Sequence, residues 1–167
     1  MTERSVIHDT FVIERTYPAS SSRVFAAFAS KEAKDTWGDT GDIAGAEPAT
    51  GPVEFDFRVG GHERFGIVYQ GVRYTYDAIY YDIVPDQRLV YSYEMYADGV
   101  RSSVSIATIE FVSVDGGTAL TWTEQGAYLN GIDGAEAPQL RRGGVSEMLD
   151  GLATYLSEEG ATNRRSS

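Results

Sequence analysis

The chain contains no cysteine, only two histidines and no long apolar run. Without cysteine it can form no disulfide, thiolate metal site or cysteine nucleophile, and the isolated His8 and His62 do not make a transition-metal site. We therefore expect no metal and no cofactor. The lack of a run of about eighteen apolar residues excludes a membrane-spanning helix. No phosphate-binding glycine loop, nucleophile elbow or dinucleotide fingerprint occurs either.

Basic residues are also scarce, since 14 Lys and Arg stand against 25 Asp and Glu and give a formal net charge of −11. Nucleic-acid binding needs a basic surface, and basic residues cluster only at Arg141-Arg142 and Arg164-Arg165. We expect neither a nucleic-acid partner nor a membrane partner. Residues Met1–Thr10 lack the basic-then-apolar pattern of a secretory signal, which predicts a cytoplasmic protein.

The chain does have the length and composition of one globular domain. Its 167 residues, 42% of them apolar, suffice for a hydrophobic core, and its 18 glycines indicate many turns. We predict a single domain over residues 1–167, of which residues 161–167 form a disordered tail.

Alternating apolar and polar residues, separated by short turn clusters, predict an antiparallel sheet. The first strand is His8–Tyr17. Two short helices follow, one after the serines at 20–22 and one over Glu32–Trp37, and then a loop from Gly38 to Gly51. The remaining predicted strands are Val53–Val59, Glu63–Gln70, Tyr74–Val84, Leu89–Tyr96, Ser102–Val114 and Thr118–Gln125.

The last regular element is a long amphipathic helix from Pro138 to Glu158. Its apolar side holds four residues at steps of four, three and four: Val145, Leu149, Leu152 and Leu156. A second stripe holds Gly144, Met148, Gly151 and Tyr155. A glycine inside a helix costs about 1 kcal/mol relative to alanine. Either something packs very close to this stripe, or space is left open beside it.

Four places in the chain carry a family resemblance. They are Ile13–Ala19 with Arg23–Phe25, Trp37-Gly38, Asp56–Gly61, and Gly117–Gly126 with Gly144 and Met148–Leu156. Together they resemble the helix-grip superfamily called SRPBCC or START-like, and within it the branch of the activator of the heat-shock-protein-90 ATPase. The chain departs from that branch in having Thr36 where a second tryptophan is common, and Val145 where many members carry tryptophan.

The resemblance spans about residues 8–159 and implies an α+β helix-grip fold. In this fold a seven-stranded antiparallel sheet curls around a long C-terminal helix, two short helices follow the first strand, and a cavity often lies between sheet and helix. One activity is not implied, because the superfamily is a scaffold for many.

Eight of the eleven tyrosines lie between Tyr69 and Tyr96. Strand alternation places Tyr76 and Tyr80 on the face opposite Tyr81, and Tyr91 and Tyr93 on the face opposite Tyr96. A buried tyrosine needs a partner for its oxygen, which favours a tyrosine-lined cavity, although tyrosines also form good strands and several fit an outer face. Trp37 and Trp122 fit the cavity wall and the core equally. The candidate ligand-binding residues are Trp37, Phe57, Tyr76, Tyr80, Tyr91, Tyr93, Trp122, Met148, Gly151, Leu152 and Tyr155.

The charged candidates indicate no catalytic group. Asp56 and Arg58 share a strand face; we favour a structural pair, the alternative being that Arg58 meets an anionic group of a ligand. Gly60-Gly61 allows a tight bend. His62 and Glu63 are neighbours on a strand and point to opposite faces, which argues against a joint acid–base role. We expect Glu110 and Glu124, both on strands, to be exposed to solvent.

Three functions remain open. The first is binding or carriage of a small, mostly apolar or aromatic molecule between the sheet and the C-terminal helix. The second is an enzyme of the cyclase or aromatase type that the family includes, with acid–base groups drawn from Tyr, Asp, Glu, Arg or His62. The third is a co-chaperone-type protein partner. A homodimer through a sheet edge or outward-facing tyrosines is also left open.

Overall fold

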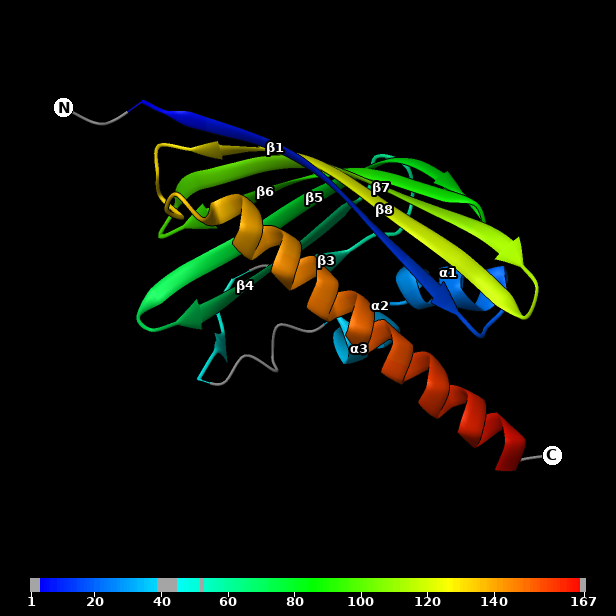
Figure 1. Cartoon of the computed structure of the whole chain (residues 1–167). Helices are drawn as coiled ribbons and strands as arrows, with labels where there is room; N and C mark the ends of the chain where they lie inside the picture. The colour runs from blue at the N-terminus through cyan, green and yellow to red at the C-terminus, as the bar shows by residue number, and fades with distance from the viewer. Residues whose placement is uncertain (1–3, 39–44, 52, 166–167) are drawn as a thin grey trace.

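A single antiparallel sheet curls around one long helix in the computed structural model (Figure 1), which describes residues 4–38, 45–51 and 53–165. The helices are α1 (Ser21–Ala29), α2 (Lys31–Trp37) and α3 (Ala137–Arg165). The strands are β1 (Val6–Tyr17), β2 (Glu47–Pro48), β3 (Glu54–Phe55), β4 (His62–Tyr69), β5 (Val72–Val84), β6 (Arg88–Ala97), β7 (Val100–Val114) and β8 (Gly117–Leu129). The α+β helix-grip prediction is confirmed.

The sheet runs in the order β1-β8-β7-β6-β5-β4-β2, with β3 also paired to β4. From β4 to β8 each strand pairs with the next along the chain, and β1 closes the far edge against β8. Two of the hairpins turn through consecutive residues with positive φ, Gln70-Gly71 and Asp98-Gly99. Such turns match the right-handed twist of the strands and hold the register across β4–β5 and β6–β7.

The strand count differs from the prediction at one edge of the sheet. Where we expected a strand over Val53–Val59, only Glu54 and Phe55 pair with β4. The chain then turns, because the Arg58 N–H donates to the Asp56 carbonyl and the Gly61 N–H donates to the Arg58 carbonyl. A short strand, β2, lies in the stretch expected as loop over 38–51, of which residues 39–44 are outside the described residues. The sheet therefore has eight strands and not seven.

Two short helices cover one end of the curled sheet (Figure 1). Each begins at a serine whose hydroxyl accepts a backbone N–H, Ser20 for α1 and Ser30 for α2. Trp37 closes α2, is buried, and donates its indole N–H to the Ala27 carbonyl at 2.9 Å. The two helices thereby form one packed unit.

Helix α3 lies across the concave face of the sheet (Figure 1). The predicted apolar stripe is buried: Val145, Leu149, Leu152 and Leu156. Burying one such side chain contributes about 1.5–3 kcal/mol to the free energy of folding, so this stripe stabilises the packing of α3 on the sheet. The backbone stays helical to Arg165, beyond the predicted end at Glu158 and through part of the segment 161–167 expected as a tail; residues 166–167 lie outside the described residues.

The two glycines of the second stripe have different surroundings. A Cβ on Gly151 would lie 2.7 Å from the Trp37 carbonyl oxygen, so this glycine lets α3 pack against the end of α2. A Cβ on Gly144 would meet nothing within 4 Å. Of the two explanations offered by the sequence, close packing accounts for Gly151 and open space for Gly144.

Candidate functional site

The concave face of the sheet carries a continuous group of aromatic rings on β4, β5, β6 and β8. The Tyr76 ring stacks on Phe65 at 4.9 Å between centroids and lies 5.1 Å from Tyr93. Tyr91 lies 6.0 Å from Tyr93 and 6.3 Å from Trp122, the latter edge-on. The stacked pair and the edge-on pair have preferred aromatic geometries, and the two pairs with Tyr93 are tilted. Together the rings form a wall that is apolar in its rings and polar at its hydroxyl groups.

One end of this wall holds a buried carboxylate, Glu63 of β4. Lys34 of α2 donates to both of its oxygens at 2.8 and 2.6 Å, and the Tyr80 hydroxyl donates to Oε2 at 2.8 Å. The Lys34 side chain is itself largely buried, and its ammonium group lies over the Phe55 ring. The pair needs this geometry because an uncompensated buried charge is strongly destabilising.

The other end holds a second buried carboxylate, Glu124 of β8, which is 0% exposed. The Tyr93 hydroxyl donates to Oε2 at 2.8 Å and the Trp122 indole N–H donates to Oε1 at 3.3 Å. The Arg141 guanidinium of α3 stands 3.8 Å from Oε2. It also donates to the Tyr93 hydroxyl, and to two serine hydroxyls of β7, Ser105 and Ser103.

Burial changes the acid–base properties of this end. It raises the pKa of Glu124 above the usual value for a carboxyl group, while Arg141 and the hydrogen bonds from Tyr93 and Trp122 act in the opposite direction. Burial also raises the pKa of Tyr93, and of Tyr80 at the other end, so that both hydroxyls are protonated at neutral pH.

Tyr76 and Tyr91 lie between the two carboxylate clusters, and no described residue is hydrogen-bonded to their hydroxyl groups. Among the described residues, every buried side-chain nitrogen or oxygen that a water molecule cannot reach has a hydrogen-bond partner. Tyr91 is 7% exposed, and its oxygen must therefore border space that a water molecule or ligand can occupy. Burial raises the pKa of both tyrosines strongly.

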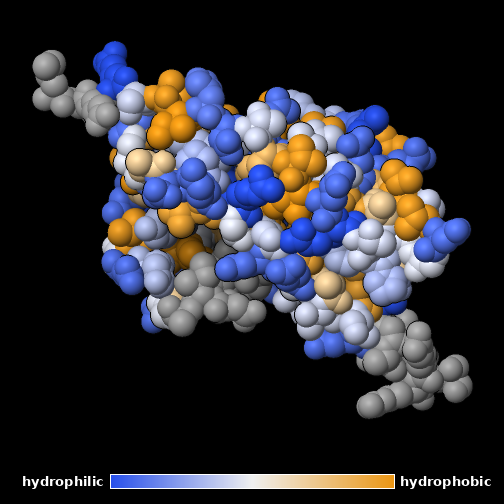
Figure 2. All heavy atoms as spheres, in the orientation of Figure 1, coloured by the Kyte–Doolittle hydropathy of each residue, from blue (hydrophilic) through white to orange (hydrophobic). Residues whose placement is uncertain are grey.

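Figure 2 is consistent with an opening into this region. In the space-filling view, apolar side chains line the floor of a hollow between α3 and β4. Both polar and apolar side chains border it in this view.

The structure gathers part of the predicted set of ligand-binding residues in the aromatic wall, most of which also belongs to the buried core, and places the rest where α2 and α3 pack together. Tyr76, Tyr80, Tyr91, Tyr93 and Trp122 form the aromatic wall, as the strand alternation predicted. Phe57 packs edge-on against Tyr80, and Met148 and Tyr155 of α3 are partly buried against the same core. Trp37, Gly151 and Leu152 belong to the packing between α2, α3 and the core. Contact of any of these residues with a ligand stays a prediction.

The expected exposure of Glu124 is wrong, whereas Glu110 is exposed as expected. The signal for Glu124 was available, because it continues the alternation of Leu120 and Trp122 and must share their buried face. Sequence reasoning also missed Lys34 and Arg141 as partners of buried carboxylates. Nothing local indicates them, since the interacting residues are separated by 29 positions for Lys34–Glu63 and 48 for Arg141–Tyr93.

The other charged residues considered as candidates from the sequence interact with neighbouring residues of the protein. His62 and Glu63 do point to opposite faces, with His62 3.2 Å from Asp77 on the outer face. Arg58 donates to Asp56 at 2.7 Å in an exposed pair next to the turn. A Cβ on Gly61 would lie 2.1 Å from the Asp56 carbonyl oxygen, which explains the second glycine of that turn.

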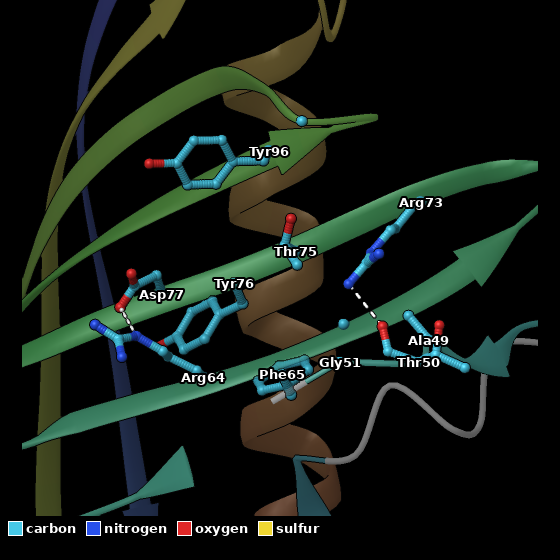
Figure 3. Close-up of a pocket in the computed structure, with 12 residues that line it drawn as sticks. Ala49, Thr50, Gly51, Arg64, Phe65, Arg73, Thr75, Tyr76, Asp77 and Tyr96 are labelled. Atoms are coloured by element: carbon cyan, nitrogen blue, oxygen red, sulfur yellow. Dashed lines mark hydrogen bonds and ion pairs between the residues drawn. The ribbon is translucent and has the colours of Figure 1, made fainter. Parts of the chain in front are cut away.

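A pocket of about 280 Å³ lies where the segment from Ala49 to Gly51 faces β4, β5 and β6, and Phe65 and Tyr76 of the aromatic wall are among its lining residues (Figure 3). Figure 3 shows Arg64 turned toward Asp77 and Arg73 turned toward the Thr50 carbonyl. Arg64 also pairs with Glu54 at 3.0 Å, so its charge is compensated within the protein. Arg73 has a carbonyl and not a carboxylate as its partner among the described residues, so the lining keeps one positive charge.

Across the described part of the chain, no three His, Asp or Glu side chains gather to hold a metal ion. None of its helices combines the length and the hydropathy required to cross a bilayer.

The comparisons with known proteins agree with this architecture. The family described as Activator of Hsp90 ATPase homolog 1-like protein matches residues 18–157. Protein Mll3558 of Rhizobium loti is 45% identical, with 90% of this chain and 99% of that chain covered and a TM-score of 0.77. A protein of Rhizobium leguminosarum is 38% identical, with 93% and 98% covered and a TM-score of 0.81.

A more distant structure shares the fold alone. DynU16, a protein of the dynemicin biosynthetic locus, is 19% identical over 89% of this chain and 47% of its own, with a TM-score of 0.58. No curated protein matches the sequence. The family match covers most of the chain, and the helix-grip architecture agrees with it. The chain therefore belongs to the family of Activator of Hsp90 ATPase homolog 1-like proteins.

Proposed function

We propose that the protein binds a small, mostly apolar or aromatic molecule between the concave face of the sheet and α3. The observation that carries this proposal is the Tyr91 hydroxyl, which is deep in the protein, has no hydrogen-bond partner among the described residues and borders accessible space. A core built for packing alone favours Leu, Ile and Val, which bring no hydroxyl to satisfy. Bound ligand or water supplies the missing partner.

The surroundings of Tyr91 support an aromatic ligand. Tyr76, Tyr93 and Trp122 present ring faces and edges in one region, and Met148 of α3 packs beside the core from the opposite side. Methionine is adaptable and makes favourable contacts with aromatic rings. A flat apolar molecule fits such walls better than a flexible polar one.

Acid–base catalysis on a bound molecule is the second candidate, because one observation favours it. Glu124 is a buried carboxylate with a raised pKa, hydrogen-bonded to Tyr93 beside the region of Tyr91. Perturbed titratable groups next to a cavity are typical of active sites, although structural ion pairs perturb pKa values as well. If the wild-type protein converts a bound molecule and Glu124→Gln does not, catalysis becomes the preferred function.

A co-chaperone-type protein partner would bind at a different surface. Apolar side chains are exposed on the outer face of β1 and β7, among them Val12, Ile106 and Val112. A protein partner would use that surface and not the concave face. Its binding would be insensitive to changes at Tyr91.

Two measurements test the binding proposal. Native mass spectrometry of freshly purified protein, compared with the denatured sample, is expected to show an added mass that disappears on denaturation. The uncharged fluorescent probe N-phenyl-1-naphthylamine is expected to bind saturably. Met148→Trp, which fills space beside the core, should weaken that binding. Glu147→Trp, one residue away and exposed, should not. The proposal is refuted if the folded protein shows neither an added mass nor saturable probe binding.

A further inference from the structure

We infer that the ligand of this site is an uncharged molecule that presents an acceptor oxygen, such as an aromatic ketone or quinone, to the hydroxyl groups of Tyr91 and Tyr76. The inference rests on the proposed function and deepens it by naming the class of ligand. It depends on two features of the concave face: the balance of its charges and the identity of its unused hydrogen-bonding groups.

The buried charges of the site cancel in pairs. Lys34 contacts both oxygens of Glu63, and Arg141 stands beside Glu124. Two carboxylates and two cations leave no net charge at the ends of the aromatic wall. An ionic group on the ligand would enter this interior without a counter-charge, which is strongly unfavourable unless the group is neutralised. The charge balance therefore favours an uncharged ligand.

The carboxylates are also already occupied as acceptors. Glu63 receives the Tyr80 hydroxyl together with Lys34, and Glu124 receives Tyr93 and Trp122. Tyr80 and Tyr93 therefore use their hydroxyl hydrogens within the protein. Tyr76 and Tyr91, on the same face, have no such acceptor among the described residues.

The free hydroxyl groups of Tyr76 and Tyr91 can each donate a hydrogen bond as well as accept one. Burial raises the pKa of both, so each hydroxyl retains its hydrogen at neutral pH. A buried donor without an acceptor is rarer in proteins than an acceptor with an unused lone pair. The group that complements this wall is accordingly an acceptor oxygen, and the aromatic rings around it fit a flat skeleton.

Three naphthalenes of similar size separate the effect of an acceptor oxygen on binding from the effect of a negative charge. The first, 2-acetylnaphthalene, has a carbonyl acceptor; 2-isopropenylnaphthalene has the same shape without it; 2-naphthoate carries a negative charge. Dissociation constants are measured by isothermal titration calorimetry. One hydrogen bond is worth about 1 kcal/mol, so the ketone is expected to bind about fivefold more tightly than the hydrocarbon. The naphthoate is expected to bind more weakly than both.

Variants of the two tyrosines test whether their hydroxyl groups cause the preference for the ketone. Tyr91→Phe should reduce the ratio between ketone and hydrocarbon toward one while leaving hydrocarbon binding unchanged. Tyr76→Phe should reduce the same ratio and serves as the second variant if the first does not fold. Tyr81→Phe is the matched control, since Tyr81 is 60% exposed and lies outside this wall.

The outcomes distinguish the inference from the proposed function. Equal binding of all three probes, or tightest binding of the naphthoate, overturns the inference and leaves the binding site standing. A ketone preference that persists in both tyrosine variants also overturns it. Failure of every probe to bind, together with the absence of an added mass in the native spectrum, overturns the proposed function itself.

Discussion

Replacing Arg141 by methionine should destabilise the protein by an amount that depends on pH. Arg141 is largely buried, with a side chain 15% exposed, and it stands 3.8 Å from a fully buried Glu124 carboxylate. At an effective dielectric constant of about 20, two charges at that distance attract by about 4 kcal/mol. Breaking a buried pair by removing one partner typically costs about 3–5 kcal/mol, which agrees. We expect Arg141→Met to lower the free energy of unfolding by about 4 kcal/mol at pH 8.

The pH dependence follows from the carboxyl group that is left behind. Arg141 is the strongest influence that lowers the pKa of Glu124, so its removal raises that pKa further above the ordinary value. A group whose folded pKa is raised contributes stability below its unfolded pKa of about 4.3 and loses it as pH rises through the folded value. The loss caused by Arg141→Met should therefore be smaller at pH 5 than at pH 8.

Urea unfolding monitored by tryptophan fluorescence at the two pH values measures this difference. Adding Glu124→Gln to Arg141→Met removes the stranded charge and should restore most of the stability lost at pH 8. Arg142→Met is the matched control, because Arg142 is exposed, and it should change stability by less than about 0.5 kcal/mol. A loss that is equal at both pH values, or that the double variant does not restore, would refute the assignment of Arg141 and Glu124 as a buried pair.

Three further changes test the packing around the site by the same unfolding assay. Gly151→Ala should destabilise the protein by about 1–3 kcal/mol, since the new Cβ would lie 2.7 Å from the Trp37 carbonyl oxygen. Gly144→Ala places its Cβ in open space and should stabilise the protein by about 0.5–1 kcal/mol. Equal effects of the two changes would contradict the packing role of Gly151. Tyr17→Phe should cost about 1 kcal/mol, because the Tyr17 hydroxyl donates to the Leu149 carbonyl of α3 at 2.8 Å, and an unchanged midpoint would show that this bond contributes nothing. Lys34→Met should cost about 3 kcal/mol by stranding Glu63, with Lys31→Met, which is exposed, as the control; similar small losses in both would argue against a buried Lys34–Glu63 pair.

Much of the fold was predictable because its signals are local. Alternation located β1 and β4 to β8, and the step of three and four residues located the buried stripe of α3. The prediction failed at Val53–Val59, where alternation continues but the backbone turns at Arg58. Two glycines and a local hydrogen-bonded turn outweighed strand propensity there, so β3 is reduced to two residues.

The candidate site was predictable only in its aromatic half. Strand parity was enough to group Tyr76, Tyr80, Tyr91 and Tyr93, because a side chain's face depends on its own strand. Parity also places Glu124 with Trp122, but burial of a carboxylate requires a cation, and that cation comes from α3. No local pattern could show that Arg141 turns inward while its neighbour Arg142 is exposed.

The sequence by itself determined the family, the antiparallel meander and the amphipathic helix, since periodicity and short motifs act over a few residues. The tertiary structure alone decided which charges are buried together, why Gly151 is a glycine, and that the Tyr91 hydroxyl lacks a partner among the described residues. These features arise from contacts between residues far apart in the chain, and the energy of a buried charge or hydroxyl depends on all the groups that surround it.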